Sequence, residues 1–500
     1  MSYKYSFPDG WAEGELQEFC IKVADGTHDS PKKSDDGKLL VTSKNIIGGI
    51  LDLSKSYRIS EGDFNEVNRR SKVDINDVLL SMIGTVGEAC LIEQEPDFAI
   101  KNVGLLKNDD PLRAKWLYFY LTSPQAQAQI KERLRGTTQQ YLPLGEIRKF
   151  PIIFPESRAL MQSIVEILGA LHNKIQLNHQ INQTLEQMAQ ALFKSWFVDF
   201  EPVKAKIAAL EAGGSEEDAL LAAMQVIAGN ARECASAAEG RAPGTATGGK
   251  LARLQAEQPE RYAELRATAK LFPSAMQDSE LGEIPVGWEV DSLASKIDVF
   301  NGFAFKSGDY VKQPGIFVLR TKNFNNENIA VRLSDDVFLP EGFGSSHKKY
   351  LCEAYDYHLI MVGASVGKTG IIFPCNLPAL RNQNMWCFRP KFGARIGKAF
   401  TKHMLDELVS QKVGLASGSA REFFRKGDFQ NQTICFGSEH IQNSFHSIVF
   451  SLLEKQAINV AENGCLSALR DALLPKLLSG ELPMTDTDAR LAKVEEPVDV

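Results

Sequence analysis

The sequence has no long hydrophobic run and no export signal. No stretch reaches 18 consecutive apolar residues, and the first ten residues are polar, without the apolar centre of a signal peptide. We therefore expect a cytoplasmic protein with no membrane partner. No CxxC pair occurs, which argues against a zinc ribbon or a redox motif and favours reduced, mostly buried thiols. The eight cysteines are Cys20, Cys90, Cys234, Cys352, Cys375, Cys387, Cys435 and Cys465.

Catalytic motifs are also missing. The sequence has no GxSxG motif, no NPPY-like tetrapeptide of an amino-methylating enzyme, no clear PD…ExK nuclease cluster and no helicase motor. His28, His347 and His358 lie near acidic residues, but no second ligand follows at metal-site spacing. Gly363–Thr369 resembles a phosphate loop, yet three residues separate its glycines where four are needed, which favours a glycine turn between strands. We predict no catalytic centre and no metal site.

Positive charge is scarce in the chain as a whole. The net charge is −7, with 56 basic and 63 acidic residues, which at first argues against a nucleic-acid partner. The charge is uneven, however, because residues 284–437 carry 19 basic and 14 acidic groups. Local charge, not the total, attracts phosphate. The sequence therefore contains one basic module, which permits DNA binding without establishing it.

The sequence does contain an internal duplication. Six segments of the first half recur in order in the second half, at an offset that drifts only from 277 to 282. Each match is weak alone, but the shared order indicates two copies of one domain; the alternative is that β-rich segments reuse Gly and Asn in turns. The matches are Pro8–Trp11 with Pro285–Trp288, Gly37–Ile46 with Gly315–Phe324, Asp77–Gly84 with Asp356–Gly363, Val86–Gly87 with Val366–Gly367, Ala99–Asn102 with Ala379–Asn382, and Gly136–Gly145 with Gly418–Gly427.

Each copy is expected to be a mixed α/β domain of about 150 residues, which is long enough for its own core. Short apolar or β-branched runs bounded by Gly, Asn or Asp predict strands at Leu39–Thr42, Val78–Ile83 and Ile316–Leu319. Helices are predicted over Trp116–Ile130 and Phe400–Val413, at the same place relative to the strands of each copy.

A long helix is predicted after each copy. In both stretches, the residues that would line one side of the helix recur at spacings of four and three, as in a coiled coil. This line of residues, the seam, is less apolar in the second stretch. Asn178 and Asn182 in the first seam recur as Asn459 and Asn463 in the second, and buried asparagines fix register at a cost in stability. We predict that the helices pair, Asn facing Asn; the alternative is a solvated edge. A helix over residues 157–197 would be ~60 Å long and would hold two domains apart.

Residues 203–270 differ from the rest of the chain. They contain 19 alanines, Tyr262 as the one aromatic residue, and a glycine-rich stretch at Gly240–Gly249. This composition predicts one or two helices around a flexible loop and not a third core domain. The acidic tail after Gly480 is expected to be loose.

Polar residues at strand ends and in loops are the candidates for a binding role. Asparagine pairs bidentately with adenine, and arginine or lysine with guanine or phosphate. Glycines and apolar residues recur between the copies while candidate positions such as Thr42/Arg320, Gln139/Arg421 and Gln140/Glu422 diverge, as expected if each copy reads a different sequence. For any one candidate, the alternative is a turn residue or a solvated lysine.

Several segments together resemble the specificity subunit of type I restriction-modification systems. These are Asp25–His28 with Ser30-Pro31, Lys174–Asn178 through Ser195–Phe200, Asp278–Gly282 with Ile284-Pro285 and Gly287-Trp288, and Leu473–Gly480. The resemblance covers essentially the whole length. It departs from the family pattern in the long insertion at residues 203–270 and in the less apolar second seam.

The resemblance implies a mixed α/β (α+β) fold with two similar target recognition domains joined by two long helices packed as an antiparallel coiled coil, with pseudo-two-fold symmetry. Each recognition domain would read one half of a split, asymmetric DNA sequence. The expected segments are a first recognition domain at 1–156, a first spacer helix at 157–200, an insertion and linker at 201–283, a second recognition domain at 284–437, a second spacer helix at 438–480 and a tail at 481–500.

The resemblance also implies partners and cofactors. The helices would dock two methyltransferase (modification) subunits, restriction subunits would complete the complex, and the partners would use S-adenosylmethionine, ATP and Mg, with no cofactor and no catalytic residue on this chain. Double-stranded DNA would be the ligand. The candidate contacts are Thr27, His28, Thr42, Lys44, Asn45, Lys101, Gln139, Gln140, Tyr141, Phe305, Lys306, Arg320, Lys322, Asn323, Arg381 and Arg421.

Two other functions stay open at this point. One is a duplicated coiled-coil scaffold that never reads DNA. The other is a P-loop nucleotide hydrolase built on Gly363–Thr369, for which Lys368→Ala would abolish hydrolysis.

Overall fold

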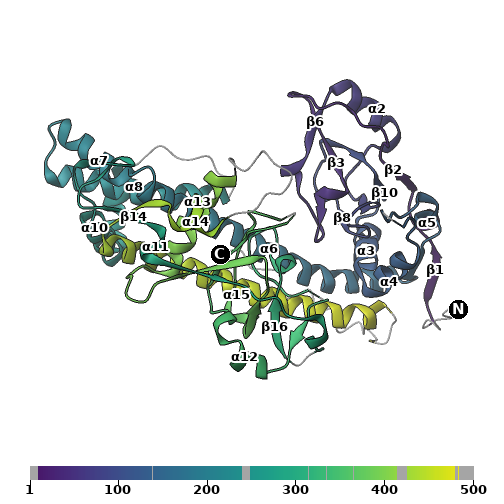
Figure 1. Cartoon of the computed structure of the whole chain (residues 1–500). Helices are drawn as coiled ribbons and strands as arrows, with labels where there is room; N and C mark the ends of the chain where they lie inside the picture. Colours follow the sequence, from purple (N-terminus) through teal and green to yellow (C-terminus); the bar gives the residue numbers. More distant parts are fainter. Residues whose placement is uncertain are drawn as a thin grey trace. The chain divides into compact units, whose positions relative to one another are not determined.

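The computed structural model of the chain describes residues 9–137, 139–238, 248–312, 315–333, 335–363, 365–413, 425–478 and 482. The chain divides into two compact units (Figure 1). The first unit comprises the chain up to Gln176 and from Cys465 onward, and the second comprises Leu177–Gly464. Each unit contains one mixed α/β domain and part of each of two long helices.

Among its described residues, the domain of the first unit contains three sheets and one further short hairpin. The four-stranded antiparallel sheet has the order β2 (Lys22–Asp25), β10 (Val103–Lys107), β7 (Val78–Ser81), β8 (Ala89–Leu91). The three-stranded sheet has the order β6 (Tyr57–Ile59), β3 (Lys38–Thr42), β9 (Phe98–Lys101), with β3 and β9 parallel. A two-stranded sheet pairs β1 (Trp11–Glu15) with β11 (Pro151–Pro155), and a short hairpin pairs β4 (Ile46–Ile47) with β5 (Ile50–Leu51).

One face of the four-stranded sheet is covered by buried helical residues. The predicted helix at Trp116–Ile130 is in fact two helices, α3 (Pro111–Thr122) and α4 (Pro124–Glu132). Pro124 has no N–H to continue the first helix, and Ser123 caps the second by accepting from Ala126 N. Both helices pack into one core cluster with β7 and β10. The remaining helices of this domain are α1 (Leu16–Phe19), α2 (Glu61–Ser71) and α5 (Leu144–Arg148).

The domain of the second unit has the same sheets in the same order. Its four-stranded sheet runs β15 (Ile297–Asn301), β21 (Met385–Pro390), β18 (Tyr357–Ile360), β19 (Thr369–Ile371). Its three-stranded sheet runs β17 (Phe338–Leu339), β16 (Ile316–Leu319), β20 (Ala379–Arg381), again with one parallel pair. The pair β14 (Glu289–Ser292) and β22 (Thr433–Phe436) matches β1 and β11. Its helices are α11 (Leu293–Lys296), α12 (Gly342–Ser346), α13 (Lys398–Val413) and α14 (Lys426–Gln430).

The predicted duplication is therefore confirmed at the level of topology. Strand order, strand direction and the one parallel pair in the three-stranded sheet are identical in the two domains. The predicted helix at Phe400–Val413 corresponds to α13, which packs on β21 and β18 as α3 does on its own sheet. A shared topology with few shared residues is what an ancient duplication leaves behind.

The two long helices are α6 (Arg158–Phe197) and α15 (Glu439–Leu478). In the first unit, Leu474 and Leu477 of α15 share a core cluster with Ile164 and Leu168 of α6. In the second unit, Trp196 of α6 packs edge-on against Phe445 of α15, with ring centroids 6.0 Å apart. Residue numbers rise in α6 as they fall in α15, so the helices are antiparallel, as expected.

Residues 201–270 contain more helix than the composition predicted. The structure has four helices there: α7 (Glu201–Glu211), α8 (Glu216–Ala238), α9 (Gly248–Glu257) and α10 (Pro259–Lys270). Met224 and Leu251 of this region, and Phe272 just after it, belong to the same buried cluster as Trp196. The insertion is thus part of the core of the second unit. A hairpin of β12 (Met276–Ser279) and β13 (Gly282–Pro285) follows it. Residues 239–247, which include most of the predicted flexible loop, and nearly all of the tail lie outside the described residues.

The glycine segment at Gly363–Thr369 is a turn, as expected. It joins the antiparallel strands β18 and β19, and Thr369 begins β19, so no helix follows it. A phosphate loop needs a helix N-terminus after its glycines. The structure therefore excludes the P-loop hydrolase. Among the described residues, no helix is long and apolar enough to cross a membrane.

Candidate nucleic-acid interface and helix pair

Three loops meet at one edge of the first domain, and we call them the first turn cluster: residues 26–30, 42–45 and 101–102. Thr27 forms a parallel bridge with Lys101, and Ser43 Oγ donates to Asn102 O at 3.0 Å. Gly26 is required there because a Cβ at this position would lie 2.3 Å from Ile100 O. The structure thus brings together candidates that lie up to 75 residues apart in sequence.

His28 is held at the surface of this cluster. Its Nδ1 lies 2.8 Å from Asn102 Oδ1 and its Nε2 lies 2.9 Å from Asp25 Oδ2, yet 63% of its side chain is exposed. Arg70 stabilises the same loop by donating a hydrogen bond to Gly26 O at 2.8 Å. Both ring nitrogens are therefore engaged within the loops, and it is the rest of the side chain that is exposed to a ligand.

Lys44 and Asn45 are neighbours with different roles. Asn45 is buried, accepts from Thr42 N at 2.8 Å and donates to Asp52 O at 2.9 Å, so it caps the 3₁₀ turn η1 (Ser43–Asn45). Lys44 is exposed on the same turn. The expectation that Asn45 contacts a base is corrected, because its hydrogen-bonding groups are used inside the fold.

The same turn recurs in the second domain as η4 (Thr321–Asn323). Asn323 is fully buried, accepts from Arg320 N at 3.0 Å and donates to Asp336 Oδ1 at 2.7 Å. It too is a capping residue and not a base contact. Lys322 is exposed and pairs with Asp335, and Arg320 pairs with Asp336 Oδ1 at 3.5 Å. Part of the charge of these two candidates is thus neutralised by the loop itself.

The second turn cluster consists of residues 302–306, 320–323 and 381–384. Phe303 N donates to Arg381 O at 3.2 Å, and Gln383 N donates to Phe303 O at 2.9 Å. Gly302 matches Gly26, since a Cβ there would lie 1.7 Å from Asn382 O. Both domains therefore build the same three-loop edge with different side chains on it.

The surface of the second cluster is aromatic and basic. The Phe303 ring centroid lies 4.9 Å from those of both His347 and Tyr350. The flanking residues Lys306, Lys348 and Lys349 are exposed. Phe305 is 8% exposed and packs beneath Phe303, so its predicted contact with DNA is replaced by a packing role. Aromatic rings flanked by cations suit a nucleic-acid ligand.

Arg381 is buried and does not match Lys101, contrary to the expectation. In the parallel pairs, Val41 lies opposite Ile100 while its equivalent Leu319 lies opposite Arg381. The true partner of Arg381 is therefore the buried Ile100, one residue away from the sequence match. Its guanidinium donates to the carbonyls of Asn301, Lys349 and Leu351 and clamps these loops.

The loop with Gln139, Gln140 and Tyr141 lies outside the first turn cluster. Tyr141 and Arg135 exchange two backbone hydrogen bonds of 2.9 Å, which close a tight loop with exposed Gln139 and Gln140 side chains. Tyr141 is 43% exposed. Arg421, the predicted counterpart of Gln139, lies outside the described residues. Among the described residues, no hydrogen bond or ion pair joins this loop to the first turn cluster, so we treat the two as separate candidate patches.

The helix pair of the second unit contains a buried layer of four asparagines. Asn178 Nδ2 donates to Asn463 Oδ1 at 2.9 Å, and Asn459 Nδ2 donates to Asn182 Oδ1 at 2.9 Å. Equivalent positions of the two helices are 281 residues apart, so Asn178 corresponds to Asn459 and Asn182 to Asn463. The two hydrogen bonds are therefore equivalent to each other. The pairing of asparagine with asparagine is thus present, and its hydrogen bonds obey a two-fold relation.

A buried ionic network connects α6 to the second domain. Lys402 of α13 forms ion pairs with Glu186 of α6 and, at 2.9 Å, with Asp406. Burial alone would raise the pKa of Glu186, but the ammonium of Lys402 outweighs it and lowers that pKa to about 2. Burial lowers the pKa of His403, beside this pair, to about 3. Burial raises the pKa of Asp406, the other carboxyl of the network. The pair of Glu186 and Lys402 is charged at neutral pH and holds α13 against the long helix.

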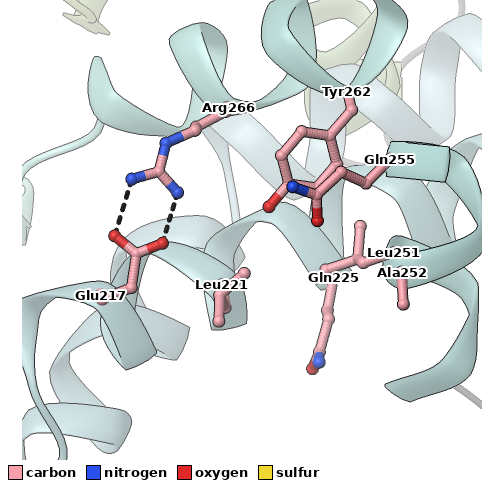
Figure 2. A pocket seen from close by; sticks show the side chains of 8 residues that line it. All are labelled: Glu217, Leu221, Gln225, Leu251, Ala252, Gln255, Tyr262 and Arg266. Carbon is pink, nitrogen blue, oxygen red and sulfur yellow. Dashed lines mark hydrogen bonds and ion pairs between the residues drawn. The ribbon is translucent and has the colours of Figure 1, made fainter. Parts of the chain in front are cut away.

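A cavity of about 500 Å³ lies among three helices of the insertion (Figure 2). Arg266 and Glu217 close one end with a bidentate ion pair, so the charged groups of this lining satisfy each other. The rest of the lining is apolar, amide or phenolic. The cavity is the gap between amphipathic helices, and its described lining residues include no thiol, imidazole or unpaired carboxylate. They are Glu217, Leu221, Gln225, Leu251, Ala252, Gln255, Tyr262 and Arg266.

Comparison with known proteins matches this architecture. The family described as "Type I restriction modification DNA specificity domain" matches residues 8–187. The chain is 32% identical over 360 residues to the type I restriction enzyme HindI specificity subunit of Haemophilus influenzae, covering 71% of this chain and 73% of that protein. It is 23% identical over 387 residues to the MjaIX specificity subunit of Methanocaldococcus jannaschii, covering 75% and 70%. A type I S subunit from M. genitalium aligns over 95% of this chain and 98% of its own, with a TM-score of 0.43 and 14% identity.

The fold and these relatives define a class of protein that selects DNA without cutting or methylating it. The chain belongs to the family of type I restriction-modification specificity subunits, and it is the non-catalytic, DNA specificity component of such a system.

Proposed function

We propose that each recognition domain reads one half of a bipartite, asymmetric DNA sequence through its turn cluster. The observation that carries this proposal is the pair of topologically identical domains whose equivalent loop edges bear different side chains. Shared backbone geometry supports the same approach to DNA, and divergent side chains support different half-sites. The six-segment division of the chain given above is part of the proposal.

The contact set is revised by burial. Asn45, Asn323, Arg381 and Phe305 are left out because they are buried. The exposed lysines are assigned to phosphates or guanine, and the amide, hydroxyl and imidazole groups to base edges. The proposed contacts in the first domain are Thr27, His28, Thr42, Lys44, Lys101, Gln139, Gln140 and Tyr141, and in the second Lys306, Arg320, Lys322 and Arg421.

The proposal for partners is that two methyltransferase subunits dock on the helix pair and flip the target adenine, using S-adenosylmethionine, while restriction subunits supply ATP- and Mg-dependent cleavage in the cytoplasm. Leu177 and Ile458 support two equivalent docking points. They are 49% and 60% exposed, and they are equivalent under the 281-residue offset of the helices. Exposed apolar side chains at two-fold-related positions suit two copies of one partner.

Substituting these docking residues tests the partner proposal. Leu177→Glu or Ile458→Glu should each remove one methyltransferase from the purified complex, as measured by native mass spectrometry, because a charge replaces one apolar contact. Ile21→Glu is the control, since Ile21 is 63% exposed but lies on the first domain and not on a long helix. Full occupancy by two methyltransferases in the double variant would overturn this assignment.

A domain swap tests the DNA proposal. Replacing residues 1–155 by the equivalent domain of a relative should change one half of the methylated sequence and leave the other half and the spacing intact. A coiled-coil scaffold without DNA readout would instead retain its partners with no change in methylated sites. That result would contradict the proposal.

A further inference from the structure

The second domain carries two lysines beside its turn cluster that the proposed contact set does not include. Lys348 and Lys349 belong to the 3₁₀ turn η5 (Lys348–Tyr350), and both side chains are exposed. The backbone of this turn is fixed to the second turn cluster, because the buried guanidinium of Arg381 donates to Lys349 O. Lys349 Nζ lies 5.0 Å from the centroid of the Tyr350 ring. The two ammonium groups therefore extend the aromatic and basic surface of the cluster.

The first domain has a basic pair at the equivalent position. Arg69 and Arg70 lie in the last turn of α2, which connects β6 to β7 as α12 and η5 connect β17 to β18. Arg69 precedes Asp77, and Lys348 precedes Asp356, by the same eight residues. The two aspartates match in sequence, and each directly precedes its strand, β7 or β18. The arginine pair and the lysine pair are thus equivalent.

In the first domain, each arginine of the pair has a carboxylate partner. Arg69 Nη1 lies 2.7 Å from Glu66 Oε2, and Arg70 Nη2 lies 3.2 Å from Asp25 Oδ1. The same nitrogen of Arg70 donates to Gly26 O in the first turn cluster. A phosphate would have to compete with these carboxylates for the guanidinium groups.

The second domain lacks those carboxylates. Asp25 lies opposite Gly104 of β10, and Asn301 lies opposite Trp386 of β21. Gly104 and Trp386 each lie opposite the third residue after the aspartate that precedes β7 or β18, so Asn301 occupies the position of Asp25. The helix α12, which lies before the lysines, contains no acidic residue. Among the residues that the structure describes, neither lysine of the pair has a carboxylate partner.

We propose that Lys348 and Lys349 bind phosphates of duplex DNA beside the second half-site, and that the equivalent arginines of the first domain are held by carboxylates instead. The inference rests on the proposed function, because that function brings DNA to the second turn cluster. Lysine binds phosphate as a point charge, and phosphate contacts position a protein on DNA without reading its sequence. The charge balance agrees, since residues 284–437 carry 19 basic and 14 acidic groups while residues 1–155 carry 20 and 22.

The test measures how the complex of this chain with its methyltransferase partner binds a duplex of random sequence at a series of salt concentrations. Each phosphate contact contributes about 0.9 to the slope of log affinity against log salt concentration. Lys348→Ala/Lys349→Ala should therefore lower this slope by about 1.8, so that the affinity lost between about 50 and 200 mM salt is about 12-fold smaller than in wild type. The fold should be retained, because Arg381 bonds to the backbone of Lys349 and not to its side chain.

Two single variants serve as matched controls for Lys348→Ala, which should lower the slope by about one. Arg69→Ala changes the equivalent residue of the first domain and should lower the slope by less than half as much. Lys391→Ala removes a charge just after the end of β21 that is remote from the second turn cluster, since Gly302 of the cluster bonds to Met385 at the other end. It should leave the slope unchanged.

An unchanged slope in the double lysine variant would overturn the phosphate contact. An equal loss of slope in Arg69→Ala would overturn the difference between the domains, and an equal loss in Lys391→Ala would show an effect of total charge in place of a contact. The random duplex contains no recognised sequence, so these results are independent of half-site reading, which the domain swap tests separately.

Discussion

At the residue scale, the direction of a side chain within a turn decides whether a polar residue stabilises the fold or faces a ligand. Lys44 and Asn45 are adjacent in sequence, yet one is exposed and the other is enclosed by its own turn. Sequence pattern alone treats both as candidates, because a lysine-asparagine pair after a strand suits either role. The distinction depends on the direction of each side chain in a 3₁₀ turn, which the sequence did not show.

These neighbours make a matched pair of variants. Asn45→Ala should destabilise the first domain by about 1–3 kcal/mol, since it leaves buried backbone groups unpaired. Lys44→Ala should leave stability within about 0.5 kcal/mol but weaken DNA binding by the assembled complex and lower its salt slope by about one. Thermal melts and DNA titrations at several salt concentrations measure both. An unchanged salt slope in Lys44→Ala would exclude the phosphate contact.

Arg381 shows where residue-level matching fails. The sequence aligns it with Lys101, but the parallel pairing places it opposite Leu319, at the position of Ile100. A shift of one residue along a strand turns a side chain from one face of the sheet to the other. Register comes from hydrogen bonding between distant strands, so a weak repeat in the sequence cannot fix it.

At the element scale, the long helices were the most predictable part of the chain. Spacings of four and three continue over many turns, and the recurrence of two asparagines is enough to identify the partner helix from the sequence alone. The insertion was less predictable, because an alanine-rich composition indicates helix without indicating how many helices form or what they pack on. Its packing against Trp196 depends on contacts between segments distant in sequence.

The asparagine layer leads to a prediction about register. Asn459→Leu alone should lower the stability of the helix pair by about 1–3 kcal/mol, because the buried amide of Asn182 loses its partner. The double variant Asn182→Leu/Asn459→Leu should recover that stability, since two apolar groups then face each other. Chemical denaturation of the purified chain measures both changes. A double variant less stable than the single one would contradict a register role for this layer.

At the scale of the whole molecule, the duplication explains most of the architecture. Two domains of one topology and two helices that pair antiparallel follow from one ancestral unit used twice. Net charge misleads at this scale: the chain is acidic overall, while the second domain is basic and carries its aromatic cluster between lysines. What the duplication could not predict is where the copies differ, as they do in the loops of the turn clusters.

The central claim is that the two domains read two different half-sites at a fixed separation. Genome-wide mapping of methylated adenines, after co-expression of this chain with its methyltransferase partner, tests it most directly. The account predicts one motif with two unlike halves separated by a constant number of unspecified base pairs. A continuous motif, a palindrome with identical halves, or methylation independent of this chain would contradict it.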